Sequence, residues 1–135
     1  MTIFIYDTLR SEFDIGNVVR MRSRLGVVGD KVAASAPGKL YDAYNMPLTM
    51  VYSADDTCRV VGEVIEVDAD KVSELDEYEH ALSRQEVEVY LEDNSVVKAA
   101  AYVAAGNISP EARVIEGGDW VKYCRRPLGP MRVFG

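Results

Sequence analysis

Hydrophobic positions occur along the chain in short runs, which predict many short strands and a few short helices. The first run, Ile3 to Tyr6, contains no charged position and is typical of a strand that is buried on both faces and central in its sheet. Residues 15–25 then place mostly apolar side chains at helical spacing, and Gly26 and Gly29 interrupt this pattern. We therefore expect a buried first strand followed by a helix.

The next part of the chain predicts three short strands, around residues 32–34, 39–41 and 48–51. Pro37-Gly38 separates the first two strands, and the segment 45–47 separates the last two. Both separators are turn signals, because proline and glycine interrupt regular strand pairing.

Residues 59–67 are rich in β-branched side chains and predict another strand. The acidic residues Asp68 and Asp70 follow it and can cap a helix over residues 71–78. The order predicted here is a strand followed by a short helix.

A strict alternation of apolar and polar residues from Arg84 to Glu92 predicts a half-buried strand. Asp93-Asn94-Ser95 is a turn signal, and residues 96–104 return as a second strand, so the two form a hairpin. Beyond it, a short helix is expected over residues 110–116 and an irregular tail over residues 122–132. These elements together predict an α+β domain, with a small barrel as a candidate architecture.

The length of 135 residues fits one domain spanning residues 1–135. Against 22 acidic residues stand 15 lysines and arginines, which gives a formal net charge of -7. We expect neither a nucleic-acid nor an anionic-membrane partner, because phosphate binding depends on clustered cations. The sequence carries no information on the oligomeric state.

Two cysteines, Cys58 and Cys124, lie far apart in the sequence and suggest neither a disulfide framework nor a cysteine-rich metal site. The single histidine, His80, excludes a histidine metal cluster and is best explained as a surface residue. No apolar run approaches the roughly 20 residues that span a bilayer. With reduced thiols and no leader-like segment, the cytoplasm is the expected location.

Several short motifs follow one another in an order that resembles the γ-glutamyl cyclotransferase-like (AIG2-like) family, which includes γ-glutamylamine cyclotransferases. Phe4-Ile5-Tyr6-Asp7-Thr8-Leu9-Arg10 is similar to the strand and Y-G-[ST]-L-[RK] loop that open its members. The later matching segments are Gly38-Lys39-Leu40-Tyr41-Asp42 with Pro47, Val61-Gly62-Glu63-Val64, Leu75-Asp76-Glu77-Tyr78-Glu79, Arg84 and Gly118-Asp119-Trp120. The set covers nearly the whole chain.

The resemblance implies a small mixed β-barrel with short flanking helices and an enzyme that needs no cofactor and no metal. Active members release a γ-glutamyl group as 5-oxoproline, when the substrate's own α-amine attacks its γ-carbonyl. Such an enzyme holds the chain folded, moves a proton and stabilises an oxyanion. The implied partner is a small γ-glutamyl compound.

By resemblance, Glu79 is the catalytic residue, a general base and acid that takes the proton from the amine and passes it to the leaving nitrogen. The loop Tyr6-Asp7-Thr8-Leu9 is implied to present backbone N–H groups to the substrate carboxylate, with Arg10 beside it. Tyr102 is a further candidate for contact with the substrate, although a core or rim position explains it most simply. Without the resemblance, Glu79 reads as a solvated residue of an acidic helix end.

The chain also departs from the family pattern. Asp7 stands where members have a glycine that permits close backbone approach, and Met46 stands where they have a tyrosine. Asp7 fits a side-chain cap of its turn as well as a ligand contact. Glu63 shares its strand face with apolar residues, and we expect it to pair with Arg84 or a tyrosine.

These departures keep two further hypotheses open. A catalytically inactive module could use the same barrel to bind a small ligand or a protein. Alternatively, Asp7 could direct the pocket toward a cationic or neutral ligand such as a polyamine conjugate, because its charge repels a substrate carboxylate.

Overall fold

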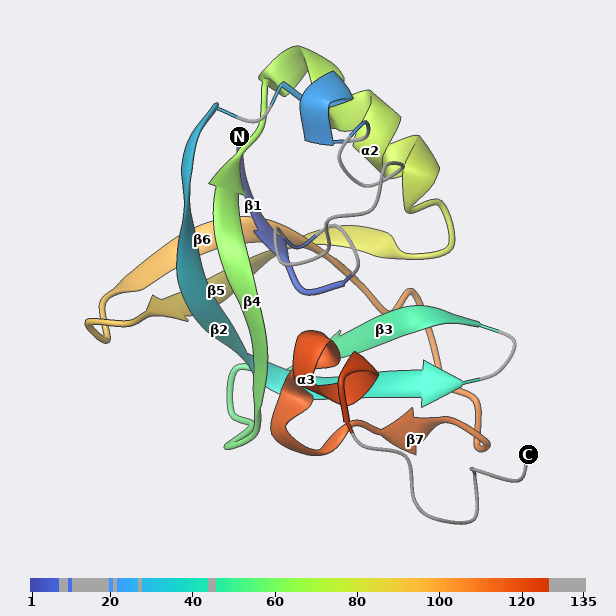
Figure 1. Cartoon of the computed structure of the whole chain (residues 1–135). Coiled ribbons are helices and arrows are strands. Elements are labelled where there is room, and N and C mark those ends of the chain that lie inside the picture. The colour runs from blue at the N-terminus through green and yellow to red at the C-terminus, as the bar shows by residue number, and fades with distance from the viewer. Residues whose placement is uncertain (8–9, 11–19, 21, 27, 44–45, 127–135) are drawn as a thin grey trace.

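A computed structural model describes the chain except for residues 8–9, 11–19, 21, 27, 44–45 and 127–135. In the described part, seven strands form one sheet that curves into a barrel with short helices outside it (Figure 1). The strands are β1 (Thr2–Ile5), β2 (Val28–Ala43), β3 (Met46–Tyr52), β4 (Arg59–Glu66), β5 (Ser83–Leu91), β6 (Val96–Val103) and β7 (Arg113–Val114). The helical segments are η1 (Ala69–Lys71), α2 (Val72–Tyr78), η2 (Glu116–Gly118) and α3 (Trp120–Cys124).

The barrel closes through strand pairs of both orientations. Its strand order is β1-β4-β2-β3-β6-β5, and additional pairings join β1 to β6 and β2 to β5. The pairings of β6 with β1 and with β3 are parallel, whereas the others are antiparallel. The expected α+β mixed β-barrel with short flanking helices is therefore confirmed.

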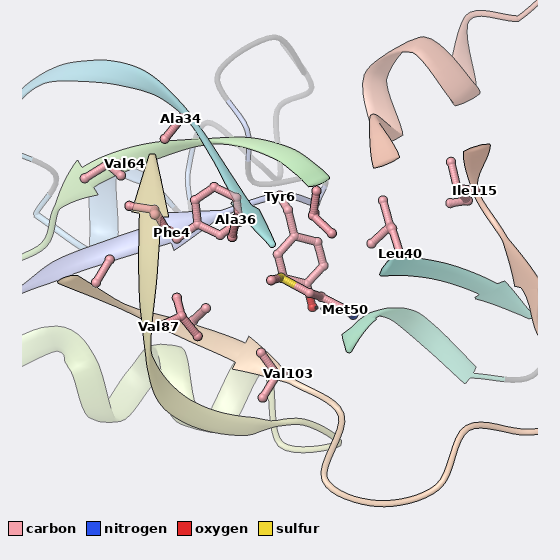
Figure 2. Packing of buried hydrophobic residues seen from close by; sticks show 14 residues of the cluster. Phe4, Tyr6, Ala34, Ala36, Leu40, Met50, Val64, Val87, Val103 and Ile115 are labelled. Carbon is pink, nitrogen blue, oxygen red and sulfur yellow. Dashed lines mark hydrogen bonds between the residues drawn. The ribbon is translucent and has the colours of Figure 1, made fainter. Parts of the chain in front are cut away.

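β1 lies between β4 and β6, as its apolar run predicts. Phe4 and Tyr6 point into the barrel, where they pack with Leu40 and Met50 (Figure 2). Ile3 and the next residue on the same face, Ile5, belong to a second buried cluster that includes Leu75 of α2. The strand is therefore buried on both faces, because one face fills the barrel and the other is covered by α2.

The expected turn at Pro37-Gly38 is wrong, because β2 runs through it as one strand of 16 residues. Residues 28–37 pair with β4, and from Gly38 onward β2 pairs with β3. Gly38 has φ +148°, and a Cβ there would lie 2.3 Å from the carbonyl oxygen of Val51. The glycine thus lets β2 bend and change partners, which forms a corner of the barrel.

The hairpin of β5 and β6 is confirmed, with Val89 opposite Val97 and Arg84 opposite Tyr102. In its turn, Asn94 has φ 66°, and the backbone N–H of Ser95 donates to the Asp93 carboxylate at 2.9 Å. The strand over 59–67 and the helix over 71–78 are also confirmed as β4 and α2. Asp68 caps η1 by accepting from the Asp70 N–H at 3.3 Å.

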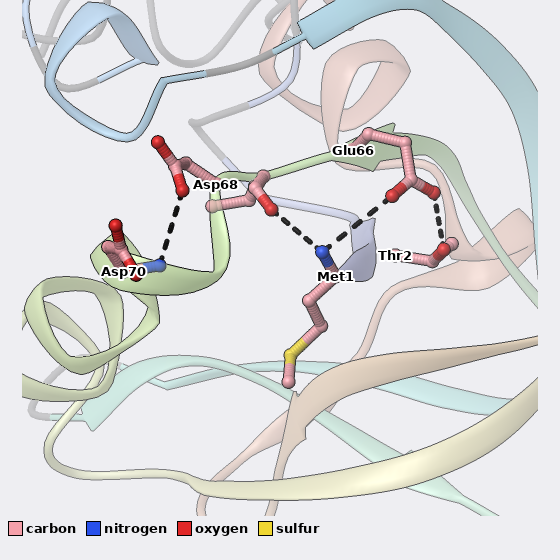
Figure 3. Close-up of polar contacts among 6 residues, drawn as sticks. Met1, Thr2, Glu66, Asp68 and Asp70 are labelled. Atoms are coloured by element: carbon pink, nitrogen blue, oxygen red, sulfur yellow. Dashed lines mark hydrogen bonds and ion pairs between the residues drawn. The ribbon is translucent and has the colours of Figure 1, made fainter.

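The chain's first residues are tied to the end of β4 (Figure 3). The terminal amine of Met1 donates to the carbonyl oxygen of Val67 at 2.8 Å and lies 3.7 Å from the Glu66 carboxylate. The Thr2 hydroxyl also donates to Glu66. These contacts fix the register of β1 beside β4, and so fix where the turn after β1 begins.

Two expectations near the C-terminus are wrong. The segment 110–116 forms the short strand β7 and the start of η2 instead of a helix, because β7 pairs with Tyr41 and Asp42 of β2. The tail is helical in α3 as far as Cys124, whereas residues 127–132 lie outside the described part. Of the helix expected over residues 15–25, the described residues are Arg20 and 22–25; Arg20 and residues 22–24 are helical, whereas Leu25 lies in a turn.

Candidate functional site

A cavity of about 300 Å³ lies where the turn after β1, the start of β3, the end of α2 and the start of α3 meet. Its described lining residues are Asp7, Pro47, Leu48, Tyr78, Glu79 and Trp120. Two other cavities, of about 300 and 510 Å³, share Glu116 and Gly117 in their walls and include neither Asp7 nor Glu79. The cavity between β1 and α2 is the candidate site because its walls hold a pair of carboxyl groups.

Glu79 reaches this cavity from the C-terminal end of α2. Its backbone N–H donates to the carbonyl oxygen of Leu75 at 2.9 Å, and its φ of -100° and ψ of 31° end the helix. The N–H of Leu82 in turn donates to the Glu79 carbonyl at 2.9 Å, which turns the chain toward β5. Glu79 is thus held by backbone bonds on both sides, and its side chain is half-buried.

Asp7 contributes the second carboxyl group of the cavity. The turn that carries it is closed by a hydrogen bond from the Arg10 backbone N–H to the Asp7 carbonyl at 3.0 Å. A side-chain hydrogen bond joins Asp7 to Glu79. Burial, followed by the nearby charge of Asp7 and this hydrogen bond, raises the pKa of Glu79 from 4.5 to about 9. At neutral pH the pair therefore holds one proton, on Glu79, and one negative charge.

Tyr6 fixes the end of β1 just before Asp7. Its buried hydroxyl donates to the carbonyl oxygen of Tyr102 at 2.5 Å and accepts from the N–H of Met50 at 3.3 Å. Burial, then the charges of Asp7 and Glu79, raise the pKa of Tyr6 well above its usual value of 10. The hydroxyl consequently stays protonated and connects β1 with β3 and β6 inside the barrel (Figure 2).

Arg10 lies at the other end of the Asp7 turn and is buried. Its Nη1 donates to Oδ1 of Asp119 at 2.9 Å. The same Asp119 carboxylate caps α3 by accepting from the N–H of Lys122 at 3.2 Å. One carboxylate therefore connects the turn after β1 with the start of α3.

Trp120, the first residue of α3, forms part of the cavity wall. Its ring stacks on Tyr123 with centroids 5.6 Å apart and planes 19° apart, and it packs against the main core. The buried indole Nε1 has no hydrogen-bond partner within the part of the chain that the structure describes.

The family model for "Gamma-glutamyl cyclotransferase, AIG2-like" matches residues 3–122. The chain belongs to this family. The match covers the strand that carries Tyr6, the helix that ends at Glu79 and the start of α3, so it includes every wall of the candidate cavity.

Solved structures with the same fold support the architecture assigned to this family member. YkqA from Bacillus subtilis superposes with a TM-score of 0.68 at 24% identity, covering 90% of this chain and 40% of YkqA. An AIG2-like protein from Mus musculus gives 0.64 at 22%, covering 82% of this chain and 80% of its own. A structure described as a gamma-glutamyl cyclotransferase gives 0.60 at 16%, covering 86% and 72%. At these identities the likeness shows the fold.

This AIG2-like chain spans less than half the length of YkqA. A comparison with curated proteins gives no significant match. None of the helices in the described ranges is both long and apolar enough to cross a membrane. Within those ranges no three histidine, cysteine, aspartate or glutamate side chains gather in the manner of a metal site.

The site residues expected from the sequence fall into two groups. Asp7 and Glu79 meet in the cavity, and Tyr6 lies beside them with its hydroxyl turned into the core. Arg10 contacts Asp119, and the residues between Asp7 and Arg10, Thr8 and Leu9, lie outside the described part. The side chain of Met46 also lies outside it.

Tyr102 is not among the described residues that line the cavity. Its hydroxyl donates to Oδ1 of Asp76 at 2.6 Å, and Arg84 holds both oxygens of that carboxylate at 3.1 and 3.0 Å. Burial and the contact with Asp76 raise the pKa of Tyr102 above its usual value. This network connects the exposed side of α2 with the hairpin of β5 and β6.

The expected pairing of Glu63 with Arg84 is wrong. Glu63 is buried on β4, and its Oε1 accepts from Nη1 of Arg22 at 3.1 Å. Arg84 is occupied by Asp76, as described above. The segment 22–25 therefore supplies a cation that the strand pattern around Glu63 could not identify.

Four lining residues were not predicted as site residues: Pro47, Leu48, Tyr78 and Trp120. Tyr78 precedes Glu79, and Trp120 belongs to the Gly118-Asp119-Trp120 segment of the family resemblance. Trp120 also packs against the main core. The missed signal was the position of Trp120 immediately after the cap of a short helix, where its ring lies between the core and the cavity.

Proposed function

We propose that this AIG2-like protein is an enzyme that releases 5-oxoproline from a γ-glutamyl amide or amine. The observation that carries the proposal is the Asp7–Glu79 pair, two hydrogen-bonded carboxyl groups in a cavity, of which Glu79 has a raised pKa. Carboxyl groups with strongly raised pKa values in a cavity are typical of proton-transfer sites. Membership of the family supplies the class of substrate.

The proposed reaction is an intramolecular aminolysis. The α-nitrogen of the γ-glutamyl group forms a bond to its own γ-carbon, and the bond between that carbon and the leaving amine breaks. The α-ammonium releases two protons: one is lost to solvent or the pair before attack, and the other leaves as the tetrahedral intermediate collapses. The leaving nitrogen takes up one proton when it departs. No other reactant is needed.

In this scheme Glu79 moves the proton. Its ionised form takes a proton from the attacking amine, and its protonated form gives one to the leaving nitrogen. Asp7 assists because its charge and hydrogen bond keep the pKa of Glu79 in the range where both forms are accessible. The cavity would also hold the γ-glutamyl chain folded, with its α-nitrogen close to its γ-carbon. This positioning lowers the entropic cost of ring closure and so accelerates the reaction.

The developing oxyanion needs a hydrogen-bond donor. Our candidate is the indole N–H of Trp120, a residue of the cavity wall whose buried Nε1 lacks a partner in the described structure. From the family resemblance alone, we also propose that backbone N–H groups of the loop Tyr6-Asp7-Thr8-Leu9 bind the substrate carboxylate. We also propose a cytoplasmic location, which fits two exposed thiols that form no disulfide.

The test is an assay for 5-oxoproline. The protein is incubated with γ-glutamyl amino acids and γ-glutamyl amines, and the product is followed by mass spectrometry. We expect turnover that falls at least roughly a hundredfold in Glu79→Gln, the usual scale for loss of a general base. Glu77→Gln is the matched control, because Glu77 is exposed on the same helix and does not line the cavity. Equal activity of Glu79→Gln and Glu77→Gln would exclude Glu79 as the proton carrier.

A second candidate function is a catalytically inactive module that binds a small ligand in the same cavity. The observation that favours it is the hydrogen bond between Glu79 and Asp7, because a carboxyl group already engaged in this way is less available to a substrate amine. A thermal-shift screen of small amines and carboxylates then gives ligand-dependent stabilisation without product. Turnover of any γ-glutamyl compound removes this candidate.

A further inference from the structure

We infer that Tyr102 is a positioning residue for Glu79, although it lies outside the described lining of the cavity. Tyr102, Asp76 and Arg84 form a clamp between the end of α2 and the barrel. The inference rests on the proposed function, because it concerns the group that moves the proton there. Three features carry it: the two hydrogen bonds of Tyr102, the position of the clamp in the chain and the exposure of its ion pair.

Tyr102 contacts both elements that carry the carboxyl pair of the cavity. Its backbone carbonyl accepts from the Tyr6 hydroxyl at 2.5 Å, and Tyr6 directly precedes Asp7. Its own hydroxyl donates to Oδ1 of Asp76 at 2.6 Å, about one helical turn before Glu79. Tyr102 is 5% exposed and belongs to the buried cluster beneath α2. Because a packed side chain keeps its rotamer, Tyr102 fixes the end of α2 relative to the turn after β1.

The clamp also encloses Glu79 along the chain. Asp76 and Arg84 are eight positions apart, with Glu79 between them. Nη1 of Arg84 donates to both oxygens of the Asp76 carboxylate, at 3.1 and 3.0 Å. Arg84 lies directly opposite Tyr102 in the hairpin of β5 and β6, and the chain from α2 enters this hairpin (Figure 1). Both ends of the segment that carries Glu79 are therefore fixed to the hairpin.

The exposure of the ion pair indicates a geometric role. The side chains of Arg84 and Asp76 are 37% and 43% exposed, so water screens their attraction. Exposed ion pairs of this kind add little to stability. Loss of the pair should consequently leave the barrel folded while the last turn of α2 gains freedom. Because the pKa of Tyr102 is raised, its hydroxyl stays protonated and remains a donor to Asp76 at neutral pH.

The pKa of Glu79 reports whether the end of α2 has moved. Burial and the contact with Asp7 raise this pKa, and both depend on where the end of α2 lies. Loosening the clamp should therefore lower it. Loss of the Arg84 cation without displacement would have the opposite effect, because removal of a nearby positive charge raises the pKa of a carboxyl group. The sign of the change thus distinguishes displacement from a purely electrostatic effect.

The experiment measures the pKa of Glu79 in the full chain by NMR titration of carboxyl carbons, without substrate. The variants are Tyr102→Phe, which removes only the hydroxyl, and Arg84→Met, which removes the cation and keeps a long side chain. We expect the pKa to fall by at least about 1 in both, and Arg84→Lys to keep part of the raised value. Arg24→Met is the matched control, because the exposed Arg24–Glu74 pair also contacts α2, but in its first turn. It should leave the pKa of Glu79 unchanged.

The 5-oxoproline assay gives a second readout. Misplacement of the proton carrier should lower kcat roughly tenfold in Tyr102→Phe and Arg84→Met, with KM changed by less than about twofold. Their midpoints in urea should stay close to that of Arg24→Met. An unchanged or higher Glu79 pKa in either folded variant overturns the inference and leaves the cyclotransferase proposal intact. If the wild type turns over no γ-glutamyl compound, the cyclotransferase proposal fails, and the pKa of Glu79 still decides whether the clamp positions it.

Discussion

The guanidinium of Arg10 donates a hydrogen bond to Asp119 at 2.9 Å, and this contact joins two walls of the candidate cavity. Arg10 closes the turn that carries Asp7, whereas Asp119 caps the helix that begins with Trp120. The two residues are 109 positions apart in sequence. Local structure alone therefore cannot determine how the Asp7 turn lies relative to the start of α3. The ion pair therefore positions the site without lining it.

Asp119→Asn is expected to destabilise the fold by roughly 3 kcal/mol, because it removes the negative charge that Arg10 contacts in a buried ion pair while asparagine still caps α3. Urea denaturation measures this loss. The control is Arg24→Met, since the Arg24–Glu74 pair is 3.5 Å apart with exposed fractions of 66% and 38% and should contribute under about 1 kcal/mol. Similar losses for both variants would contradict a special role for the Arg10–Asp119 pair.

The pKa of Glu79 shows whether the Arg10–Asp119 pair positions Asp7 in the cavity or only stabilises the fold. Arg10→Met releases the Asp7 turn from α3, so we expect Asp7 to leave Glu79 and the pKa of Glu79 to fall from about 9 toward 4.5. Carboxyl carbon shifts in an NMR titration report this change directly. Arg10→Lys should keep part of the shift, because lysine retains the charge but not the planar geometry. An unchanged Glu79 pKa in a folded Arg10→Met variant would show that the turn is held by other contacts.

The raised pKa of Glu79 also predicts the pH dependence of the enzyme. If ionised Glu79 takes the proton from the amine, kcat/KM in the wild type rises with pH up to about 9. Asp7→Asn removes the charge that is the second cause of the shift, whereas burial, the largest cause, remains. The rise should therefore move to lower pH and stay above 4.5. A pH profile with the same midpoint in both proteins would contradict the role assigned to Asp7.

The same shift affects stability with a defined sign. Folded Glu79 binds its proton more tightly than unfolded Glu79, so between pH 4.5 and about 9 the folded state holds more protons. The free energy of unfolding should then decrease as pH rises through this window, and Asp7→Asn should flatten the decrease. Denaturation at pH 5, 7 and 9 measures both slopes. A wild-type stability that is constant over this window would contradict the raised pKa.

Much of the fold follows from local pattern. The run Ile3 to Tyr6 predicts a central strand because both faces are apolar, and the alternation from Arg84 to Glu92 predicts the hairpin. The bend at Gly38 was misread as a break, because a change of strand partner and a chain reversal both place glycine after proline. The segment that contains β7 was predicted as a helix. Its two strand residues are recognisable only from their pairing with β2, which the sequence of the segment does not show.

The candidate site was predictable only in part. Glu79 and Asp7 are named by motif and lie together in the cavity, but the contact between them depends on how the end of α2 meets the turn after β1. The partners of Arg10 and Glu63 were beyond sequence reasoning. Each is a charge pair between segments more than 40 positions apart, and no periodicity relates such positions.

Gly62 offers a test of the barrel geometry. A Cβ at this position would lie 2.3 Å from the carbonyl oxygen of Ile5 and 2.8 Å from the Phe4 ring. Gly62→Ala is therefore expected to cost roughly 3 kcal/mol, the upper range for overpacking, because β1 must move. Gly106→Ala is the control, since a Cβ there meets nothing within 4 Å. Thermal melts that are equal for the two variants would contradict the close approach of β1 and β4.

Glu63 is buried with 3% of its side chain exposed, and Arg22, 19% exposed, reaches it from the segment before β2. Arg22→Met removes this cation from beside the buried Glu63 carboxylate, so it is expected to cost roughly 3 kcal/mol, measured by urea denaturation. Replacing both, in Arg22→Met with Glu63→Gln, should cost less than Arg22→Met alone, because the buried carboxylate charge is removed together with its cation. If the double variant were less stable than Arg22→Met alone, the ion pair with Arg22 would not explain why Glu63 is tolerated as a buried carboxylate on β4.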